Sequence, residues 1–421
     1  MENQNNVIAV VDIGSTKVCA MIGRVYPDGK LKVEGEGAVS CRGVKKMVYQ
    51  DPEAITTSIK RALVQAQEKA NIIVSSIYIN IGGAYLNYVK QTFELPLGGQ
   101  EKEFDENDIL QLIRQASKMK VYEDETIVGV IPIGYVVDGD TEVTDPRGLR
   151  GTSIAMKANV VIGHAEMVRI ICKCVQKIGL IVDGVIPGAT PIAYSQLRKP
   201  EKTGTTLILD VGGKVTEYIL LKDGVVLLNS CIATGGDSIT KDIAKGVDVS
   251  MADAETLKRD LGYASVETFR QNKDCYVTHA GTGGTEIVRA SYIIGIIEAR
   301  ALSILEKARR ILEKNGVPTE DIDHIVIVGE GMRSLDGLDT LIRNVFGIDG
   351  RRPDFFVETG YMPTYLTAYS IMSYIASCIA YGRSYSVSVI KKSENGSGIG
   401  GELKGVKKYI SMVKEFFTLN E

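Results

Sequence analysis

Two segments of the chain show the same order of apolar and polar positions. Residues 7–22 read VIAVVDIGSTKVCAMI and residues 206–221 read TLILDVGGKVTEYILL, so each holds an apolar run, an aspartate, a turn with glycine and a second apolar run. This order predicts a β-hairpin, because glycine supplies backbone conformations that tight turns need. Asp210 follows Asp12 by 198 positions. The sequence therefore predicts two related halves that face each other.

Each half continues with alternating helices and strands. Residues 52–71 have the three- and four-residue apolar spacing of a helix, and residues 76–81 form an apolar run typical of a strand. Alternation of this kind indicates α/β architecture. Further helices and strands are predicted at residues 164–178, 180–185, 290–314 and 323–328.

Two stretches break the alternation. Residues 84–163 hold strand-like runs around one predicted helix at residues 106–120, which indicates a compact α+β insert in the first half. Residues 236–289 predict a second, more helical insert in the second half.

Composition narrows the class of protein. A length of 421 residues predicts two to four domains, and 44% hydrophobic and 24% charged residues are ordinary for globular proteins. The net charge of −3 argues against nucleic acid as a partner. Seven cysteines lie mostly in apolar runs, which predicts buried thiols of a reducing compartment and no zinc site. No signal peptide or apolar run of ~20 residues is evident, so we expect a cytoplasmic protein whose membrane contact is peripheral.

The composition changes at Lys391. Residues 391–401 (KKSENGSGIGG) are rich in glycine, serine and charge, which predicts a flexible linker. Residues 402–421 predict an amphipathic helix, whose apolar side chains fall within an arc of roughly 140° beside a flank of lysines. The predicted membrane-contact residues are Leu403, Lys404, Val406, Lys407, Lys408, Tyr409, Ile410, Val413, Lys414, Phe416 and Phe417.

This terminal helix has two interpretations: it docks on its own body, or it lies in a membrane interface. The linker and the lysines favour the membrane, because four lysines near an anionic leaflet contribute on the order of 4 kcal/mol at ~1 kcal/mol each. Part of that is offset by ordering a helix too short to be stable alone in water. The sequence thus predicts a weak anchor, which gains avidity when many copies assemble.

The first hairpin turn has the chemistry of a phosphate site. Gly14 lets the backbone approach a phosphate, and the Ser15 and Thr16 hydroxyls can donate to its oxygens. Asp12 can hold a hydrated Mg²⁺. A plain hairpin turn explains this segment equally well by itself, but the second Asp-Val-Gly-Gly at residues 210–213 strengthens the phosphate interpretation.

A third glycine turn, Gly329-Glu330-Gly331-Met332, follows the predicted strand at residues 323–328. Glycines at the end of an α/β strand allow a ligand to lie across the backbone. A helix is predicted to begin near Ser334. Three such turns in this order indicate one nucleotide site.

This order of turns resembles the superfamily of actin, the heat-shock chaperones and the sugar kinases. Within it, the chain is similar to the bacterial cell division protein FtsA family over nearly its whole length. The segments that carry the resemblance are residues 145–151 (DPRGLRG), 179–184 (GLIVDG) and 254–258 (AETLK), together with the insert in the first half and the terminal linker and helix.

The resemblance implies an actin-like two-lobed α/β fold with a nucleotide cleft between the lobes, an α+β insert in the first lobe, a helical insert in the second and a C-terminal amphipathic helix on a flexible linker. The implied domains are a first lobe (1–83, 164–203 and 366–390), its insert (84–163), a second lobe (204–235 and 290–365), its insert (236–289), the linker (391–401) and the helix (402–421).

The resemblance also implies ATP and Mg²⁺ as cofactors, the metal being held through water by Asp12 and Asp210. Glu255 and Lys258 would approach the ribose and adenine; taken alone, they are explained as a surface ion pair. The implied nucleotide-binding residues are Asp12, Gly14, Ser15, Thr16, Lys17, Asp210, Gly212, Gly213, Lys214, Gly235, Gly236, Glu255, Lys258, Gly329, Glu330, Gly331 and Met332.

Three positions depart from the superfamily pattern. Lys214 replaces the third glycine of the second hairpin, Glu217 replaces an aspartate, and Glu330 interrupts the third turn. No residue is identified that would position an attacking water. We therefore expect binding and scaffolding, with at most weak ATPase activity.

The function that the resemblance implies is an ATP-binding adaptor that forms filaments under the cytoplasmic membrane at the division site, anchors the tail of FtsZ and helps to recruit later division proteins. The FtsZ contact would lie on the second insert. Two alternatives are a pilus-assembly actin homologue, which is not expected to carry the terminal helix, and an ATP-dependent sugar kinase, which needs a sugar pocket with a catalytic aspartate.

Overall fold

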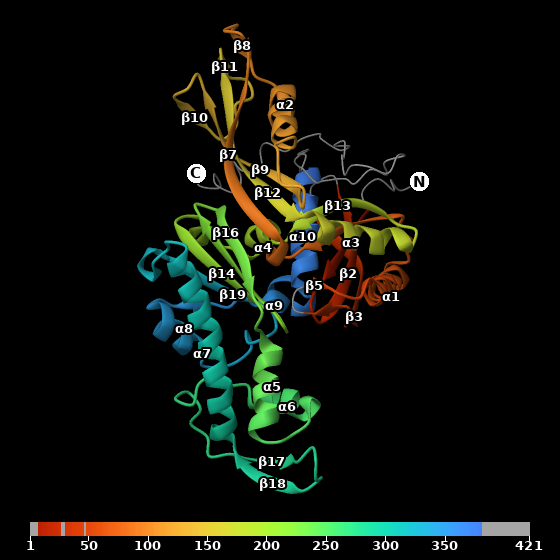
Figure 1. Cartoon of the computed structure of the whole chain (residues 1–421), viewed down its shortest axis with the longest axis vertical. Coiled ribbons are helices and arrows are strands. Elements are labelled where there is room, and N and C mark those ends of the chain that lie inside the picture. The colour runs from red at the N-terminus through yellow and green to blue at the C-terminus, as the bar shows by residue number, and fades with distance from the viewer. Residues whose placement is uncertain (1–6, 27–29, 46–47, 381–421) are drawn as a thin grey trace. The chain divides into compact units, whose positions relative to one another are not determined.

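The computed structural model describes residues 7–26, 30–45 and 48–380 (Figure 1). The chain forms two compact units. Unit 1 comprises Met1–Thr203, Lys222–Ser230 and Thr364–Glu421, and unit 2 comprises Gly204–Leu221 and Cys231–Pro363. The predicted linker and terminal helix, and residues 381–390 of the predicted first lobe, lie outside the described residues.

A five-stranded sheet forms the centre of unit 1, in the order β13-β6-β1-β2-β3. The predicted first hairpin is confirmed, since β1 and β2 pair antiparallel with Asp12 opposite Cys19. β6 pairs parallel to β1, and β13 pairs parallel to β6. The strands are β1 (Val7–Ile13), β2 (Lys17–Val25), β3 (Leu31–Ser40), β6 (Ser76–Ile81) and β13 (Ile181–Pro187).

Four helices complete the core of unit 1: α1 (Pro52–Ala70), α3 (Ala165–Lys177), α4 (Ala189–Gln196) and α10 (Leu366–Ala380). α1 begins where the Asp51 carboxylate accepts the Ala54 N–H and ends at Asn71, whose φ is +52°. Its backbone lies against β3 because two strand positions have no side chain. A Cβ on Gly37 would lie 2.2 Å from the carbonyl oxygen of Ala62.

A second five-stranded sheet repeats the topology of the first, in the order β16-β15-β14-β19-β20. In each sheet, the first three strands of that half lie side by side in chain order, and the last two strands lie on the other side of the first strand. The small β4–β5 hairpin (Val44–Lys45 and Val48–Tyr49) and the strands of the inserts belong to other sheets. β14 pairs parallel to β19 as β1 does to β6. These strands are β14 (Thr205–Val211), β15 (Thr216–Lys222), β16 (Val225–Ile232), β19 (His324–Val328) and β20 (Gly350–Arg351).

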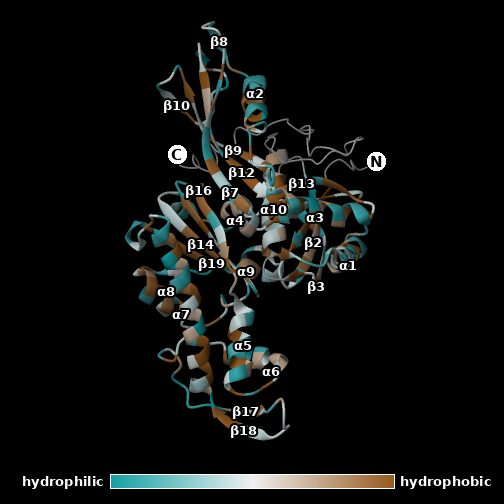
Figure 2. Ribbon diagram, in the orientation of Figure 1, coloured by the Kyte–Doolittle hydropathy of each residue, from teal (hydrophilic) through white to brown (hydrophobic). Residues whose placement is uncertain are grey.

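The central strands are mostly apolar, as Figure 2 shows for β2, β14 and β19. Such continuous apolar runs are typical of strands that are buried on both faces. The repeated sheet topology confirms the prediction of two related halves.

The long helix α7 (Ala290–Lys314) has the predicted bounds, but the helix predicted near Ser334 begins later, at Leu338 (α8, Leu338–Phe346). The reason is a backbone pairing that the local pattern does not reveal. The Asp336 N–H donates to the Gly262 oxygen and the Ala264 N–H donates to the Asp336 oxygen, both at 2.7 Å. Gly337, with φ +81°, then turns the chain into α8. A five-residue helix, α9 (Phe355–Thr359), follows.

The insert of the first half is an α+β body with its own core. Its four-stranded sheet has the order β10-β9-β12-β7, and a two-stranded sheet pairs β11 with β8. Its helix ends at Ala116 rather than at the predicted residue 120, because Ser117 and Lys118 form tight turns. Its elements are β7 (Leu86–Leu95), β8 (Lys102–Glu103), α2 (Glu106–Ala116), β9 (Glu125–Val137), β10 (Thr141–Val143), β11 (Arg150–Gly151) and β12 (Ile154–His164).

The insert of the second half combines two helices with a hairpin. α5 (Gly236–Gly246) and α6 (Met251–Leu261) match the expected helical character. The hairpin β17 (Asp274–Thr278) and β18 (Thr285–Arg289) follows them and leads into α7.

Candidate functional site: glycine turns at the ends of the central strands

The first candidate turn closes the β1–β2 hairpin in unit 1. The Gly14 N–H donates to the Lys17 carbonyl at 2.9 Å, and the Cys41 N–H donates to the Thr16 carbonyl at 2.8 Å. Asp12 is buried at the end of β1, with 8% of its surface exposed. The turn is thus fixed by backbone bonds on both sides.

Asn80 supports the same turn from β6. Its Oδ1 accepts the Ile13 N–H at 2.9 Å, in a buried contact between residues 67 positions apart. Asn80 was not predicted as a site residue. The signal in the sequence was a single amide in the otherwise apolar end of its strand, SIYINI.

The Lys17 side chain extends to the other end of the unit's sequence. Its Nζ donates to Thr364 Oγ1 at 2.5 Å, and Cys19 Sγ donates to the Thr364 carbonyl at 3.2 Å. Sequence reasoning did not predict Thr364, since no local pattern indicates a contact across 347 positions.

The second hairpin repeats the first turn. The Gly212 N–H donates to the Val215 carbonyl at 2.9 Å, which matches the bond between Gly14 and Lys17 after a shift of 198 positions. A Cβ on Gly14 would lie 3.1 Å from the accepting carbonyl, and a Cβ on Gly212 would lie 3.0 Å from its own. The internal repeat therefore extends to the hydrogen bonding of the two turns.

The glycine segments of unit 2 meet backbone to backbone. The Gly236 N–H donates to the Gly212 carbonyl at 2.9 Å, and the Gly331 N–H donates to the Val211 carbonyl at 2.7 Å. A Cβ on Gly235 would lie 2.4 Å from the Gly212 oxygen, and one on Gly236 would lie 2.7 Å from the Gly331 Cα. The second hairpin, the start of α5 and the third turn are therefore packed against one another.

Gly329 completes this cluster. Its φ is +82°, and a Cβ there would lie 2.4 Å from Asp210 Oδ1. Both facts require glycine, because the left-handed region disfavours side chains and the space is already filled.

This arrangement suits a phosphate-bearing ligand. The helix dipole adds a partial positive charge at the start of α5, whose Gly236 and Asp237 N–H groups donate to the Gly212 and Gly213 carbonyls at 2.9 and 2.7 Å. Because glycine has no side chain, a ligand can approach the peptide groups of these turns directly. The residues present therefore fit a nucleotide phosphate.

Glu255 and Lys258 are not a surface ion pair. The Lys258 side chain is only 8% exposed, and its Nζ contacts Glu255 Oε2 at 2.6 Å and Thr240 Oγ1 at 2.9 Å. It also donates to the Gly236 carbonyl at 3.3 Å. The pair thus braces the first turn of α5 at the glycine cluster.

The charge of Glu255 is set by opposing effects. Burial disfavours its ionised form, but hydrogen bonds from Lys258, Thr240 and Arg259 outweigh burial and lower its pKa below the ordinary value. Glu255 is therefore ionised at neutral pH, and it holds the Lys258 ammonium in place.

The remaining predicted residues differ in exposure. Lys214 and Glu330 are exposed, so both side chains can meet a ligand. Met332 has no exposed surface, so its side chain is buried within the protein.

Among residues 7–26, 30–45 and 48–380, no group of three or more His, Cys, Asp and Glu side chains could hold a metal ion directly. In the same ranges, no helix is both long and apolar enough to cross a membrane. The predicted membrane-contact residues, 403–417, lie outside the described part of the chain.

Comparison with known proteins connects these features to one family. The protein-family model described as "Cell division protein FtsA" matches residues 207–370. The pattern described as "SHS2 domain inserted in FTSA" matches residues 83–162, which is the α+β insert. The chain belongs to the FtsA family.

Curated FtsA proteins match most of the chain at low identity. The FtsA of Bacillus subtilis is 26% identical over 343 residues, which are 82% of this chain and 77% of that protein. The FtsA of Neisseria meningitidis is 26% identical over 353 residues, 83% and 84% of the two chains. The FtsA of Escherichia coli is 26% identical over 343 residues, 80% and 81%. This chain is accordingly an actin-like cell division protein.

Solved structures confirm the actin-like fold. A chain of the PilM–PilN type IV pilus biogenesis complex superposes with a TM-score of 0.57 at 14% identity, over 88% of this chain and 98% of that one. MreB5 of Spiroplasma citri, in a structure bound to ADP, superposes with a TM-score of 0.51 at 11% identity, over 90% and 100%.

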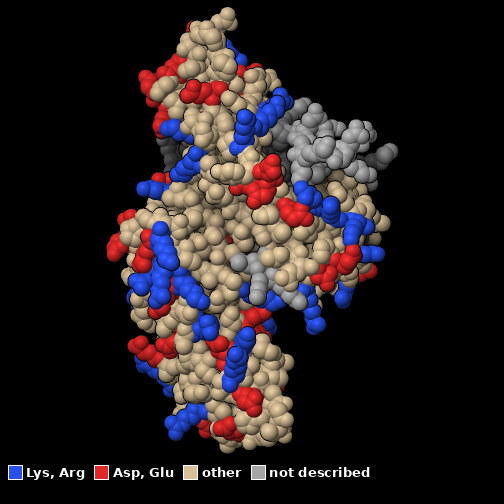
Figure 3. Space-filling model, viewed as in Figure 1, with Lys and Arg blue, Asp and Glu red and all other residues tan. Residues whose placement is uncertain are grey.

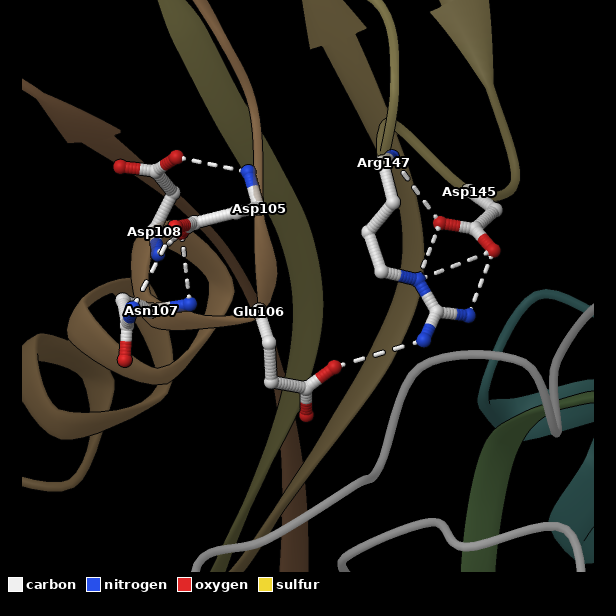
Figure 4. Close-up of polar contacts among 6 residues, drawn as sticks. All are labelled: Asp105, Glu106, Asn107, Asp108, Asp145 and Arg147. Carbon is white, nitrogen blue, oxygen red and sulfur yellow. Dashed lines mark hydrogen bonds and ion pairs between the residues drawn. The ribbon is translucent and has the colours of Figure 1, made fainter.

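The DPRGLRG motif that resembles FtsA sits in the insert and locks a loop onto α2 (Figure 4). Arg147 makes a two-pronged contact with Asp145, at 2.9 and 2.6 Å, and reaches Glu106 at 3.3 Å. Gly148, with φ +80°, donates its N–H to the Phe104 carbonyl at 3.0 Å. In this chain, the motif therefore fixes the loop after β10 against the start of α2.

Proposed function

We propose that this protein is an ATP-binding division adaptor that assembles into filaments beneath the cytoplasmic membrane and anchors FtsZ there. The observation that carries the proposal is the pair of matching glycine turns, each preceded by an aspartate, with a third glycine turn packed on the second. Membership of the FtsA family supports the role in division.

Nucleotide binding rests on the chain's own residues. Lys17 and Lys214 supply positive charge for phosphates, and the N–H groups of the turns donate to phosphate oxygens. Asp12 and Asp210 would hold Mg²⁺ through water. ATP with Mg²⁺ supplies the charge that these groups bind. We expect scaffolding rather than catalysis, with at most weak hydrolysis.

A titration with a fluorescent ATP analogue tests this step. Lys214→Ala removes an exposed cation, so we expect affinity to fall about five- to tenfold. Gly236→Ala places a Cβ 2.7 Å from Gly331 and is expected to lower affinity more than tenfold. Gly281→Ala is the matched control, because its Cβ would meet nothing within 4 Å. Equal affinity in all three variants would contradict the proposed site.

Membrane attachment is assigned to residues 402–421. Deleting them should release the protein from anionic liposomes while its circular dichroism stays that of a folded protein. Continued co-sedimentation of the truncated chain with vesicles would overturn this assignment. The location proposed is the cytoplasmic face of the membrane at the division site.

Binding of the FtsZ tail is assigned to the second insert. Its hairpin carries Tyr276 and Ile287 as cross-strand partners, and they are 76% and 57% exposed. An exposed apolar pair of this kind can accept an apolar peptide face. Ile287→Lys should weaken binding of an FtsZ tail peptide, whereas Ile73→Lys, at an exposed isoleucine of unit 1, should not. Equal loss in both variants would argue against this surface.

Later division proteins and a second copy of the chain are the further partners proposed. A pilus-assembly role is not favoured, because the likeness to the PilM–PilN chain concerns the fold alone. A sugar kinase is not favoured either, since neither sequence nor site reveals a catalytic aspartate beside a sugar pocket in the described part of the chain.

A further inference from the structure

Lys17 connects the glycine turn of unit 1 to the point where the chain returns from unit 2. The last of the crossings between the units lies between Pro363 and Thr364. Lys17 Nζ donates to Thr364 Oγ1 at 2.5 Å, and Cys19 Sγ donates to the Thr364 carbonyl at 3.2 Å. The first residue after the crossing is therefore bonded to the start of β2.

The backbone of the turn is held independently of this contact. Gly14 and Lys17 close the hairpin, Asn80 holds the N–H of Ile13, and Cys41 holds the carbonyl of Thr16. The Lys17 side chain is the adjustable part, because its four-carbon stem is flexible and its ammonium donates in several directions. Lys17 can therefore change its partner while the turn keeps its shape.

We propose that Lys17 is a latch for which Thr364 and a bound phosphate compete. This inference rests on the proposed nucleotide function. A hydroxyl is a neutral acceptor, whereas a phosphate oxygen is anionic, so only the phosphate adds the Coulomb attraction of an opposite charge to the hydrogen bond of the Lys17 ammonium. Lys17 therefore leaves Thr364 when a phosphate occupies the turn, and the Thr364 side chain loses its bond to β2.

The groups beside Thr364 do not replace Lys17 in this exchange. Burial, with smaller contributions from Cys19 and Glu36, raises the pKa of Tyr365 to about 12, so this phenol stays neutral at physiological pH. The bond that remains at Thr364 comes from a thiol, which is a weak donor. Losing Lys17 thus loosens the crossing.

Coupling of this kind is reciprocal. If phosphate weakens the contact with Thr364, then the contact with Thr364 weakens phosphate binding by the same factor. Removing the Thr364 hydroxyl should therefore tighten nucleotide binding. A hydrogen bond of ordinary net strength corresponds to a change of about three- to tenfold.

The test compares Thr364→Val with Thr364→Ser in the full chain. Valine keeps the shape of threonine but lacks the hydroxyl, whereas serine keeps the hydroxyl. We expect Thr364→Val to bind ADP about three- to tenfold more tightly than wild type and Thr364→Ser to bind within about twofold of wild type. Thermal unfolding by circular dichroism checks that both variants are folded.

Hydrogen exchange of peptides covering residues 361–366 gives a readout other than affinity. ADP should raise exchange there in wild type and Thr364→Ser. In Thr364→Val, exchange should already be raised and should not respond to ADP. Lys17→Met should show the same raised exchange without ADP, because it removes the donor.

The outcomes separate the two proposals. Equal ADP affinity in all Thr364 variants, or exchange at residues 361–366 that ignores bound ADP, overturns the latch and leaves the nucleotide function standing. Failure of wild type to bind ADP or ATP at all overturns both.

Discussion

Replacing Lys258 with methionine is the sharpest test of how the glycine cluster is supported. Methionine keeps most of the buried stem but removes the ammonium that contacts Glu255, Thr240 and Gly236. Breaking a buried pair by removing one partner typically costs ~3–5 kcal/mol, because a charge stays behind without compensation. Glu255 is 33% exposed and keeps Arg259 at 2.8 Å, so water and Arg259 offset part of that loss. We therefore expect about 2 kcal/mol of local destabilisation.

The same variant should change the acid response of α5 and α6. The pKa of Glu255 is lowered in the folded chain, so its ionisation adds stability above its unfolded pKa of about 4.3, and this is lost as the pH falls through the folded pKa. Without Lys258, burial is opposed by fewer bonds, and the pKa should rise. Lys258→Met should therefore lose less α5 and α6 protection between neutral and acid pH than wild type loses, because the folded and unfolded pKa values of Glu255 then lie closer together.

Native-state hydrogen exchange of α6 amides is the suitable assay, because a chain with two units does not guarantee one cooperative transition. Lys241→Met is the control, since it makes the same change at an exposed lysine of α5. Lys258→Met combined with Glu255→Met should recover part of the loss, because it also removes the carboxylate that Lys258 had paired with. Protection of α6 in Lys258→Met within about 0.5 kcal/mol of wild type would refute the reasoning.

Three further predictions concern other parts of the chain. Gly37→Ala should lower the free energy of unfolding of the β3–α1 region by about 2–3 kcal/mol in urea titration, because its Cβ would lie 2.2 Å from the Ala62 oxygen, whereas Gly281→Ala should change it by less than about 0.5 kcal/mol. Asp138→Asn should make the insert less sensitive to acid than wild type, since hydrogen bonds from Thr152 and Ser153 lower the pKa of Asp138 and that stabilisation is lost as the pH falls through its folded pKa; an unchanged acid midpoint by circular dichroism would argue against it. Alkylation of Cys172 should be slow at pH 8 until denaturant is added, because burial raises its pKa to about 12, and rapid labelling of the native chain would contradict this.

The hairpins and the longest helix could be predicted because their signals are local. Glycine after an aspartate between two apolar runs determines the turns at Gly14 and Gly212, and the apolar spacing of α7 extends over its full 25 residues. The repeated sheet order follows once both hairpins are recognised. The exposure and the contacts of the site residues could not be predicted from the sequence and are seen only in the structure.

What could not be predicted depends on pairs that are far apart in sequence. The start of α8 was predicted four residues too early, because the bridge between Tyr263 and Asp336 overrides the local preference for helix. The roles of Asn80 and Thr364 were missed for the same reason. Taken alone, Glu255 and Lys258 indicate only a surface pair, because i, i+3 spacing says nothing about what packs over them; their assignment to the nucleotide came from the resemblance and stays a prediction.

On the face drawn in Figure 3, basic and acidic side chains are interspersed. A protein that binds nucleic acid usually presents a concentrated basic surface instead. This face therefore offers no such footprint, in keeping with the net charge of −3.

The pairing of β7 with β12 has a consequence for how this chain could change in evolution. Leu86, at the start of the insert, is the register partner of Gly163, near its end, so both junctions lie side by side on adjacent strands. A module whose two ends are neighbours can be exchanged for another without stretching the host sheet. The exchange changes the loop-closure entropy of the host chain only a little. The host core can therefore keep its sheet while the module is remodelled for new partners.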